Sequence, residues 1–240
     1  MTEGGERGAG QVLACSLIGV ICACIRRIVV GRDGPLLLLS GGAAGSTATA
    51  SSLALFGDQL TLAYVAFFAC CAGDTWASEL GILSKSPPRL ITKPWQKVKP
   101  GSNGGVSLVG LGASAAGGML MGLLHGVFVP GGIASLLPFL PSSIVSDSLP
   151  LSQVIREVVV LTFVGFLGGF GGSLLDSFLG ATIQATYYDE SAKKIVKRPG
   201  PTVRNMGGWG FLSNEMVNVV STALSALVAA LIAQPILSYL

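Results

Sequence analysis

Long apolar stretches are the feature that most constrains the fold of this 240-residue chain. A helix that crosses a bilayer needs about 20 consecutive, mostly apolar residues. Only 11% of the residues are charged, and stretches that approach the required length lie at about 11–25, 35–56, 59–83, 104–129, 157–184 and 214–240. The sequence therefore predicts an all-α fold, in which residues 1–240 form one polytopic, integral membrane helical bundle.

Two of these stretches leave the number of spans at five or six. Residues 11–25 are short, and a run of Gly, Ala, Ser and Thr interrupts 35–56, which either spans the bilayer or re-enters it. Another stretch predicts how the helices pack, because small residues let helix backbones approach closely. Such residues recur every four positions in 104–129, so we expect Gly-rich helix packing; they are Gly110, Ser114, Gly118, Gly122 and Gly126.

Basic residues cluster in two polar connections. Residues 84–103 and 185–213 each contain five of the 15 Lys and Arg residues. Because cytoplasmic loops retain Lys and Arg, we expect both connections on the same, cytosol-equivalent side of the membrane.

The sequence has neither a P-loop motif nor a protein-kinase glycine loop. We expect membrane lipid, and no nucleic acid, as a partner.

Four carboxylates lie within or beside the apolar stretches: Asp74, Glu79, Asp176 and Glu215. A carboxylate at the centre of a bilayer costs about 3 kcal/mol, so it indicates a functional site. Asp176 shares a four-residue repeat with Gly168, Gly172, Gly180 and Gln184, which predicts that it faces the protein interior. Asp74 and Glu79 are about 140° apart on a helix. They converge only if the helix is distorted near Gly73, or else they serve different partners.

The segment that leads into the fourth stretch predicts a phosphate site. Ser102 or Asn103 is placed to cap a helix beginning near 104, while Gly104 and Gly105 leave backbone N–H groups uncovered. Nearby basic side chains add positive charge, namely Arg89, Lys97 and Lys99. Polar groups expected to support the site are Ser78, Gln184, Asn214 and Asn218, the last two on one helical face.

Four motifs carry a resemblance to a known family: 73–81 (GDTWASELG), 88–92 (PRLIT), 101–107 (GSNGGVS) and 172–184 (GSLLDSFLGATIQ). Their order and spacing resemble the transmembrane protein 19 family, also called domain of unknown function 92. The resemblance covers about residues 3–225. The chain departs from the family pattern at Cys15-Ser16, where Asn-Gly is usual, and at Ser213, where Asp is usual, which puts a ligand role at 213 in doubt.

The resemblance implies a multi-pass integral membrane protein, in a chloroplast envelope or an endomembrane if it is eukaryotic. The family includes plant phytyl-phosphate kinase, so a prenyl-phosphate kinase that uses CTP or another nucleoside triphosphate is implied. Phosphoryl transfer needs Mg²⁺ on oxygen ligands and cations on the phosphates. We expect Asp74, Glu79 and Asp176 as catalytic metal ligands, with the segment 102–105 and its neighbouring cations on the phosphates.

Two alternatives remain open at this point: an ion-coupled membrane transporter, in which acids bind cations near the midplane, and a non-catalytic membrane protein. The coupling of the acids to two basic loops on one side favours the kinase. A further expectation concerns the N-terminus, because residues 3–13 resemble a segment that lies between spans in the family. We expect a chain that lacks N-terminal spans typical of the family. Prenyl chain length, nucleotide, organelle and oligomeric state stay undetermined.

Overall fold

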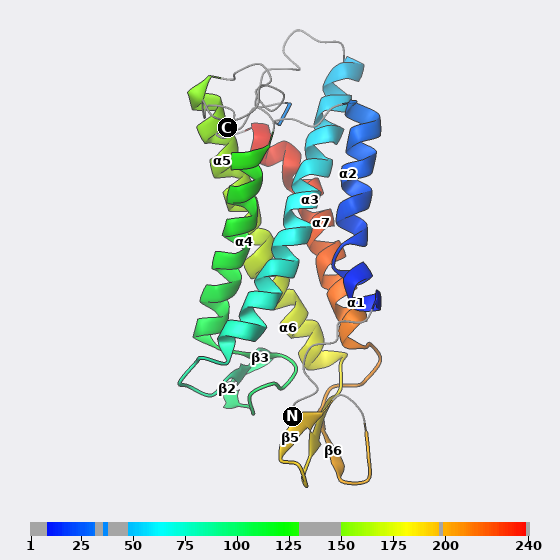
Figure 1. The fold of residues 1–240 in the computed structure, drawn as a ribbon, viewed down its shortest axis with the longest axis vertical. Coiled ribbons are helices and arrows are strands. Elements are labelled where there is room, and N and C mark those ends of the chain that lie inside the picture. The colour runs from blue at the N-terminus through cyan, green and yellow to red at the C-terminus, as the bar shows by residue number, and fades with distance from the viewer. Residues whose placement is uncertain (1–8, 32–35, 38–47, 130–149, 197–198, 239–240) are drawn as a thin grey trace.

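Helices dominate the computed structural model, which describes residues 9–31, 36–37, 48–129, 150–196 and 199–238. The helices form an elongated bundle (Figure 1). They are α1 (Ala9–Ala14), α2 (Leu17–Val30), α3 (Ala48–Gly81), α4 (Leu108–Phe128), α5 (Leu151–Phe166), the π-helix η2 (Leu167–Gly171), α6 (Gly172–Thr182) and α7 (Asn214–Ser238). Within the described residues, four segments are long and apolar enough to cross a membrane: Thr49–Gly81, Leu108–Phe128, Leu151–Thr182 and Asn214–Pro235.

Helix α3 is the centre of the bundle. It contacts α2, α4, α5, α6 and α7, and it is apolar on all sides, as expected for a helix surrounded by others. Leu62 and Val65 pack with Leu161 of α5 and Ala229 of α7 in the main core cluster. Helix α3 is therefore held in place by the helices around it.

The structure differs from the expected division between spans 35–56 and 59–83. Helix α3 runs without a break from Ala48 to Gly81. Gly57 and Asp58, which marked the expected boundary, lie within this helix. The Asp58 side chain is fully buried, and its Oδ1 accepts a hydrogen bond from the backbone N–H of Leu37 at 2.8 Å. Residues 38–47 lie outside the described residues, so the path of the first half of that stretch is not described.

Glycines occupy the closest crossings between α4 and the α5–η2–α6 segment. A Cβ atom at Gly118 would lie 2.7 Å from the Cα of Gly169, and one at Gly126 would lie 3.0 Å from the Cα of Val158. Gly169 belongs to the π-helix η2, a type of local widening that is often found near functional sites. Side chains larger than hydrogen would force these helices apart.

Two small antiparallel sheets, which an all-α prediction did not include, lie at the same end of the bundle (Figure 1). The first has the order β2-β1-β3 and the second β5-β4-β6. Their strands are β1 (Arg89–Leu90), β2 (Lys93–Lys97), β3 (Gly105–Val106), β4 (Thr186–Asp189), β5 (Lys194–Val196) and β6 (Val203–Gly207). The basic connections 84–103 and 185–213 therefore lie at one end of the molecule.

The start of α4 also differs from the expectation. Gly105 and Val106 pair with β1, so the helix begins at Leu108 rather than near 104. Ser107 is the N-cap, and its Oγ accepts a hydrogen bond from the backbone N–H of Gly110 at 3.0 Å. Capping by Ser102 or Asn103 is therefore wrong, because strand pairing separates these two residues from the helix.

Candidate functional site

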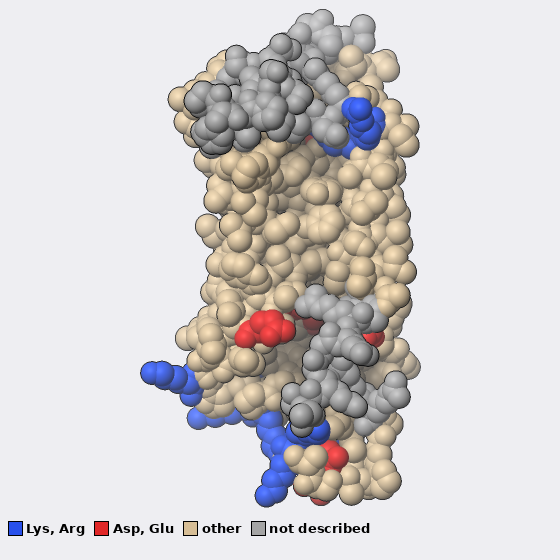
Figure 2. Space-filling model, in the orientation of Figure 1, with Lys and Arg blue, Asp and Glu red and all other residues tan. Residues whose placement is uncertain are grey.

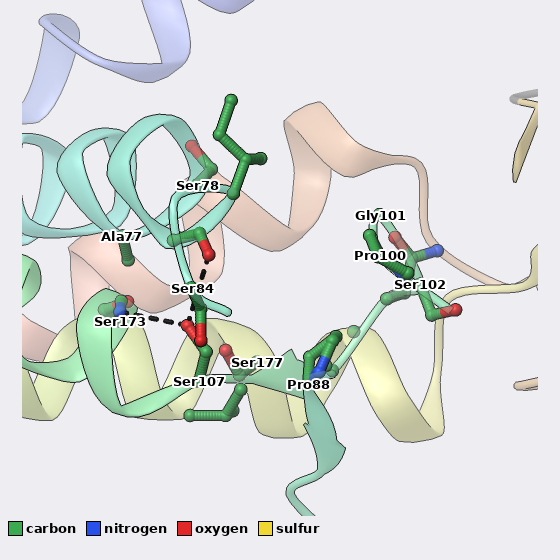
Figure 3. Close-up of a pocket in the computed structure, with 18 of the residues that line it drawn as sticks. Ala77, Ser78, Ser84, Pro88, Pro100, Gly101, Ser102, Ser107, Ser173 and Ser177 are labelled. Carbon is green, nitrogen blue, oxygen red and sulfur yellow. Dashed lines mark hydrogen bonds between the residues drawn. The ribbon is translucent and has the colours of Figure 1, made fainter. Parts of the chain in front are cut away.

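Two cavities lie at the end of the bundle that carries the strands. The larger, of about 530 Å³, is enclosed by the end of α3, the start of α4, α6 and the turn 100–105 (Figure 3). The smaller, of about 180 Å³, lies between α3, α6, α7 and Cys15. Both cavities are lined by the same four polar residues, which are Asp74, Ser78, Asp176 and Asn214. These four residues therefore form the boundary between the cavities.

Asp176, on α6, is held by donors from α7. Its Oδ2 accepts a hydrogen bond from the Ser221 hydroxyl at 3.0 Å. With the Asn218 amide oriented so that its nitrogen faces the carboxylate, Asn218 also donates to Oδ2 at 3.0 Å. Two donors on one oxygen fix the carboxylate, and its orientation toward the cavities is thereby set by the α6–α7 contact.

Asp74, on α3, faces Asp176 across the boundary between the cavities. The charges of the two carboxylates interact, and Ser173 of α6 contacts Asp74 through its side chain. The described lining of the smaller cavity contains Asp74, Glu79 and Asp176, and it includes no Lys or Arg. Acids gathered without a cation among them favour a bound positive charge.

The donor set fits Mg²⁺ through two carboxylates rather than three. Mg²⁺ prefers oxygen ligands, and proteins often hold it by one or two carboxylates together with substrate phosphates. Asp74 and Asp176 come from different helices and line both cavities, whereas Glu79 lines only the smaller one. Among the described residues, no group of three or more His, Cys, Asp or Glu side chains is placed to hold a metal ion. The expected set of three is thus not placed as one group, while Asp74 and Asp176 both line the two cavities.

The glycine-rich turn lines the larger cavity but uses its backbone N–H groups within the protein. Ser102, Asn103, Gly104 and Gly105 all face this cavity. The N–H of Ser102 donates to Lys99 O, that of Asn103 to Thr186 Oγ1 and that of Gly105 to Ser102 O. The turn therefore contributes shape and the Ser102 hydroxyl to the cavity wall. Gly104 has a φ of 72° and would place a Cβ 2.8 Å from the Cα of Ala181, so only glycine fits.

Three cations expected at the phosphates line neither cavity. The Arg89 Nη1 donates to the Pro94 carbonyl at 2.8 Å. The Lys99 ammonium lies 3.2 Å from the centre of the Tyr188 ring, and Lys97 is exposed on β2. Arg89 and Lys97 lie on strands and Lys99 follows β2, and all three are exposed, which the sequence did not predict. Lys85 is the one basic residue among the described residues lining the larger cavity.

Comparison with known proteins gives the family. A profile described as "Integral membrane protein DUF92" matches residues 1–226. The chain is also 35% identical over 224 residues to Protein PGR from Arabidopsis thaliana, covering 93% of this chain and 68% of that protein.

The chain belongs to the DUF92 family of integral membrane proteins. It is 29% identical over 181 residues to an uncharacterized membrane protein from Methanocaldococcus jannaschii, covering 75% of this chain and 55% of that protein. No solved structure matches it. With four segments able to span a bilayer, this DUF92 protein is a multi-pass integral membrane protein.

The polar residues predicted as support lie around the cavities of this DUF92 protein. The Gln184 amide donates to Asn214 Oδ1 at 3.4 Å, which links the end of α6 to the start of α7. The Ser78 hydroxyl, by contrast, donates to Thr75 O within α3. Glu215 is exposed in the first turn of α7, where the helix dipole favours an acid. Glu215 lines neither cavity.

Sequence reasoning missed several hydroxyls that contact the acids or line the larger cavity. Ser221 and Ser173 contact the two carboxylates, and Ser177 lines the larger cavity beside Asp176. Serine is common in membrane helices, so its presence alone gives no signal. Ser173 lies three residues before Asp176, on the same helical face, whereas Ser177 follows Asp176 directly and does not share that face. Their proximity became visible from the packing of α6 against α3 and α7.

Proposed function

We propose that this DUF92 protein is an integral membrane lipid-phosphate kinase. It transfers a phosphoryl group from a nucleoside triphosphate, with CTP favoured, to a prenyl monophosphate such as phytyl phosphate. The observation that carries the proposal is the pair Asp74 and Asp176, which faces a cavity of about 530 Å³ closed by the turn 100–105. Pockets for small molecules usually measure about 300–1,000 Å³, so this cavity has room for the reacting phosphates.

The depth of the two acids suits a reaction between a lipid and a water-soluble donor. Asp74 precedes the end of α3 at Gly81 by seven residues, and Asp176 precedes the end of α6 at Thr182 by six. At 1.5 Å per residue, each acid lies about 10 Å from its helix end. A phosphate at this depth stays accessible from the side of the strands, while a prenyl chain extends toward the hydrocarbon.

The cavity wall supplies groups for binding phosphate. Lys85 provides a cation, and Ser102 and Ser177 provide hydroxyl groups. Hydrogen bonds from Asn103 to β4 hold the turn in position: its side-chain nitrogen donates to Ala185 O at 2.9 Å. A phosphate site whose wall is fixed in this way positions the donor without rearrangement, which lowers the barrier to a reaction between two bound substrates.

Asp74 and Asp176 are the residues that would hold Mg²⁺. When bound, the metal ion neutralises charge on phosphate oxygens during the transfer. An oxygen of the lipid phosphate forms the new bond to the γ-phosphorus, and the bond from that phosphorus to the departing nucleoside diphosphate breaks. The attacking oxygen is already ionised, so the protein needs no general base. The chain's own residues therefore bind, orient and shield the substrates.

An ion-coupled transporter is the second candidate, because buried acids also lie toward the other end of the bundle. Asp58 and Glu157 are at most 3% exposed. Both accept hydrogen bonds from backbone N–H groups, of Leu37 and Leu36 respectively. These bonds give the two acids a structural role in holding residues 36–37 against the bundle. The kinase proposal therefore remains the better supported of the two.

The test uses the purified full chain in detergent with Mg²⁺, γ-labelled CTP or ATP, and phytyl or geranylgeranyl phosphate. We expect a labelled lipid diphosphate from the wild-type protein and almost none from Asp176→Asn. The matched control is Glu190→Gln, which removes an exposed acid that lines neither cavity and should retain full turnover. Absence of the diphosphate, together with ion flux into liposomes that contain the protein, would favour the transporter.

A further inference from the structure

The connection between α3 and α4 carries more positive charge than the cavities use. Residues 82–107 contain five Lys or Arg and no Asp or Glu. Figure 2 shows Lys and Arg gathered around the end of the molecule that carries the strands, below a broad surface with little charge. Since Arg89, Lys97 and Lys99 line neither cavity, part of this charge is available for another partner.

Strand β2 arranges two of the cations around a tryptophan. All five residues of β2 are exposed, and β2 is an edge strand of its sheet. Lys93, Trp95 and Lys97 therefore lie exposed together within one five-residue strand, whose pairing with β1 is irregular between the two lysines. The Trp95 side chain is 75% exposed. We call these three residues the Trp95 stripe.

The Trp95 stripe lies close to the ends of membrane spans. Strand β1, its partner, begins eight residues after the end of α3, and β3 on the other side of β1 leads directly into the cap of α4. A second exposed aromatic group, Trp209, is bonded to the end of another span segment. The backbone N–H of Trp209 donates to Thr182 O at 3.2 Å, and Thr182 is the last residue of α6.

We propose that the Trp95 stripe docks on the anionic phospholipid headgroups of the adjacent leaflet. Tryptophan favours the boundary between headgroups and hydrocarbon, and lysines close to an anionic leaflet are attracted to it. The exposed Lys93, Trp95 and Lys97 supply both interactions within one strand. A soluble acidic protein would satisfy the lysines, but it would not explain an exposed tryptophan beside span ends. This docking concerns the outer surface and is independent of the reaction in the cavities.

Docking would also fix the wall of the larger cavity relative to the membrane. Strand β1 pairs with β2 on one side and with β3 on the other. The Ile91 backbone N–H donates to the carbonyl of Gly104, at 2.9 Å, within the turn that closes the cavity. A headgroup contact on β2 is thus connected to this turn through β1, which pairs with β2, and through the Ile91–Gly104 hydrogen bond.

The experiment places the full chain in nanodiscs of phosphatidylcholine that contain increasing amounts of brominated phosphatidylglycerol. The fluorescence quenching of Trp95 is obtained as the difference in quenching between the wild-type protein and Trp95→Phe, a substitution at an exposed position. We expect strong quenching that declines near 1 M salt, where the screening length falls to about 3 Å. We expect Lys97→Gln to raise the phosphatidylglycerol fraction for half-maximal quenching about fivefold.

The control is Lys194→Gln, which removes an exposed cation from β5 in the other sheet and should leave this fraction unchanged. Equal quenching by brominated phosphatidylcholine would overturn the proposal, as would a titration that Lys97→Gln does not shift. If polyglutamate binds the stripe and brominated phosphatidylglycerol never quenches Trp95, the partner is an acidic polypeptide and the proposal is wrong.

Discussion

Replacing Gly169 by Ala should destabilise the bundle at the crossing of three helices. A Cβ atom there would lie 2.8 Å from the carbonyl oxygen of Ser114 and 2.9 Å from the backbone nitrogen of Gly118, both on α4. Ordinary contacts of a Cβ begin at about 3.4 Å. The shortest contact of the new methyl group is 2.5 Å, to the Cα of Gly118, and these backbone atoms cannot rotate away, so η2 and α4 must separate by about 0.9 Å to restore 3.4 Å. Overpacking of this kind costs about 1–3 kcal/mol.

The same change should reach the acids. A Cβ at Gly73, next to Asp74, would lie 2.7 Å from the Cα of Gly169, so α3 contacts η2 at this point too. Separating these helices moves Asp74 relative to Asp176, which follows Gly169 on the same continuous helix. We therefore expect Gly169→Ala to lose turnover in addition to stability.

The assay is unfolding of the purified protein in mixed detergent micelles, followed by circular dichroism. The matched control is Gly171→Ala, two residues away, where an added Cβ meets no atom within 4 Å. We expect the control to match the wild-type protein, or to gain up to about 1 kcal/mol because alanine favours a helix. Equal free energies of unfolding for Gly169→Ala and Gly171→Ala would refute the close-crossing argument.

Three further predictions follow from other parts of the molecule. Asp176→Asn should abolish turnover while leaving the unfolding transition near that of wild type, because an amide keeps the hydrogen-bonding shape and removes the charge; a fully active variant would remove Asp176 from the site. Single cysteines placed in 84–103 and 185–213 of a Cys-free protein should react with an impermeant maleimide from one side, and labelling from opposite sides would contradict this topology. Hydrogen bonds from the Ser191 hydroxyl and neighbouring groups lower the pKa of Asp189 to about 2. These bonds stabilise the β4–β5 turn fully above the usual Asp pKa of about 3.9, and the stabilisation is lost as the pH falls through about 2. Protection of the Ser191 amide proton from exchange, taken relative to the intrinsic exchange rate at each pH, should fall only in that acidic range.

The central helix shows why span boundaries were hard to predict. Gly57 and Asp58 interrupt an apolar stretch, and such a pair ordinarily marks a loop. In the structure Asp58 is buried because the backbone N–H of Leu37 satisfies it, 21 residues earlier in the chain. A partner so distant in sequence gives no local signal. The length and hydropathy of α3, in contrast, were sufficient to predict a membrane helix.

The strands were not predictable from periodicity. Strand β2 has the sequence Lys-Pro-Trp-Gln-Lys and is exposed at every position, so it shows no alternation of apolar and polar residues. Strands β1 and β3 have two residues each. Their pairing nevertheless decides where Arg89 and Lys97 point, and therefore why these cations lie outside the cavities.

For the candidate site, glycine spacing carried the useful information. The repeat through Asp176, Gly180 and Gln184 predicted one inward face, and all three residues line the larger cavity. Asp74 and Glu79 both line the smaller cavity, and only Asp74 also lines the larger one. The hydroxyl that fixes Asp176 comes from Ser221, 45 residues away. Such a contact depends on helix packing and has no sequence pattern.

The measurement that tests the central claim most directly is the stoichiometry of phosphoryl transfer by the purified protein. Nucleoside diphosphate and lipid diphosphate are quantified together over time, with and without the prenyl monophosphate. If the pair Asp74 and Asp176 holds Mg²⁺ for direct transfer between the bound phosphates, one nucleoside diphosphate should appear for each lipid diphosphate, and none without the lipid. Nucleotide hydrolysis that proceeds equally without the lipid, or no reaction with any prenyl monophosphate, would contradict the account.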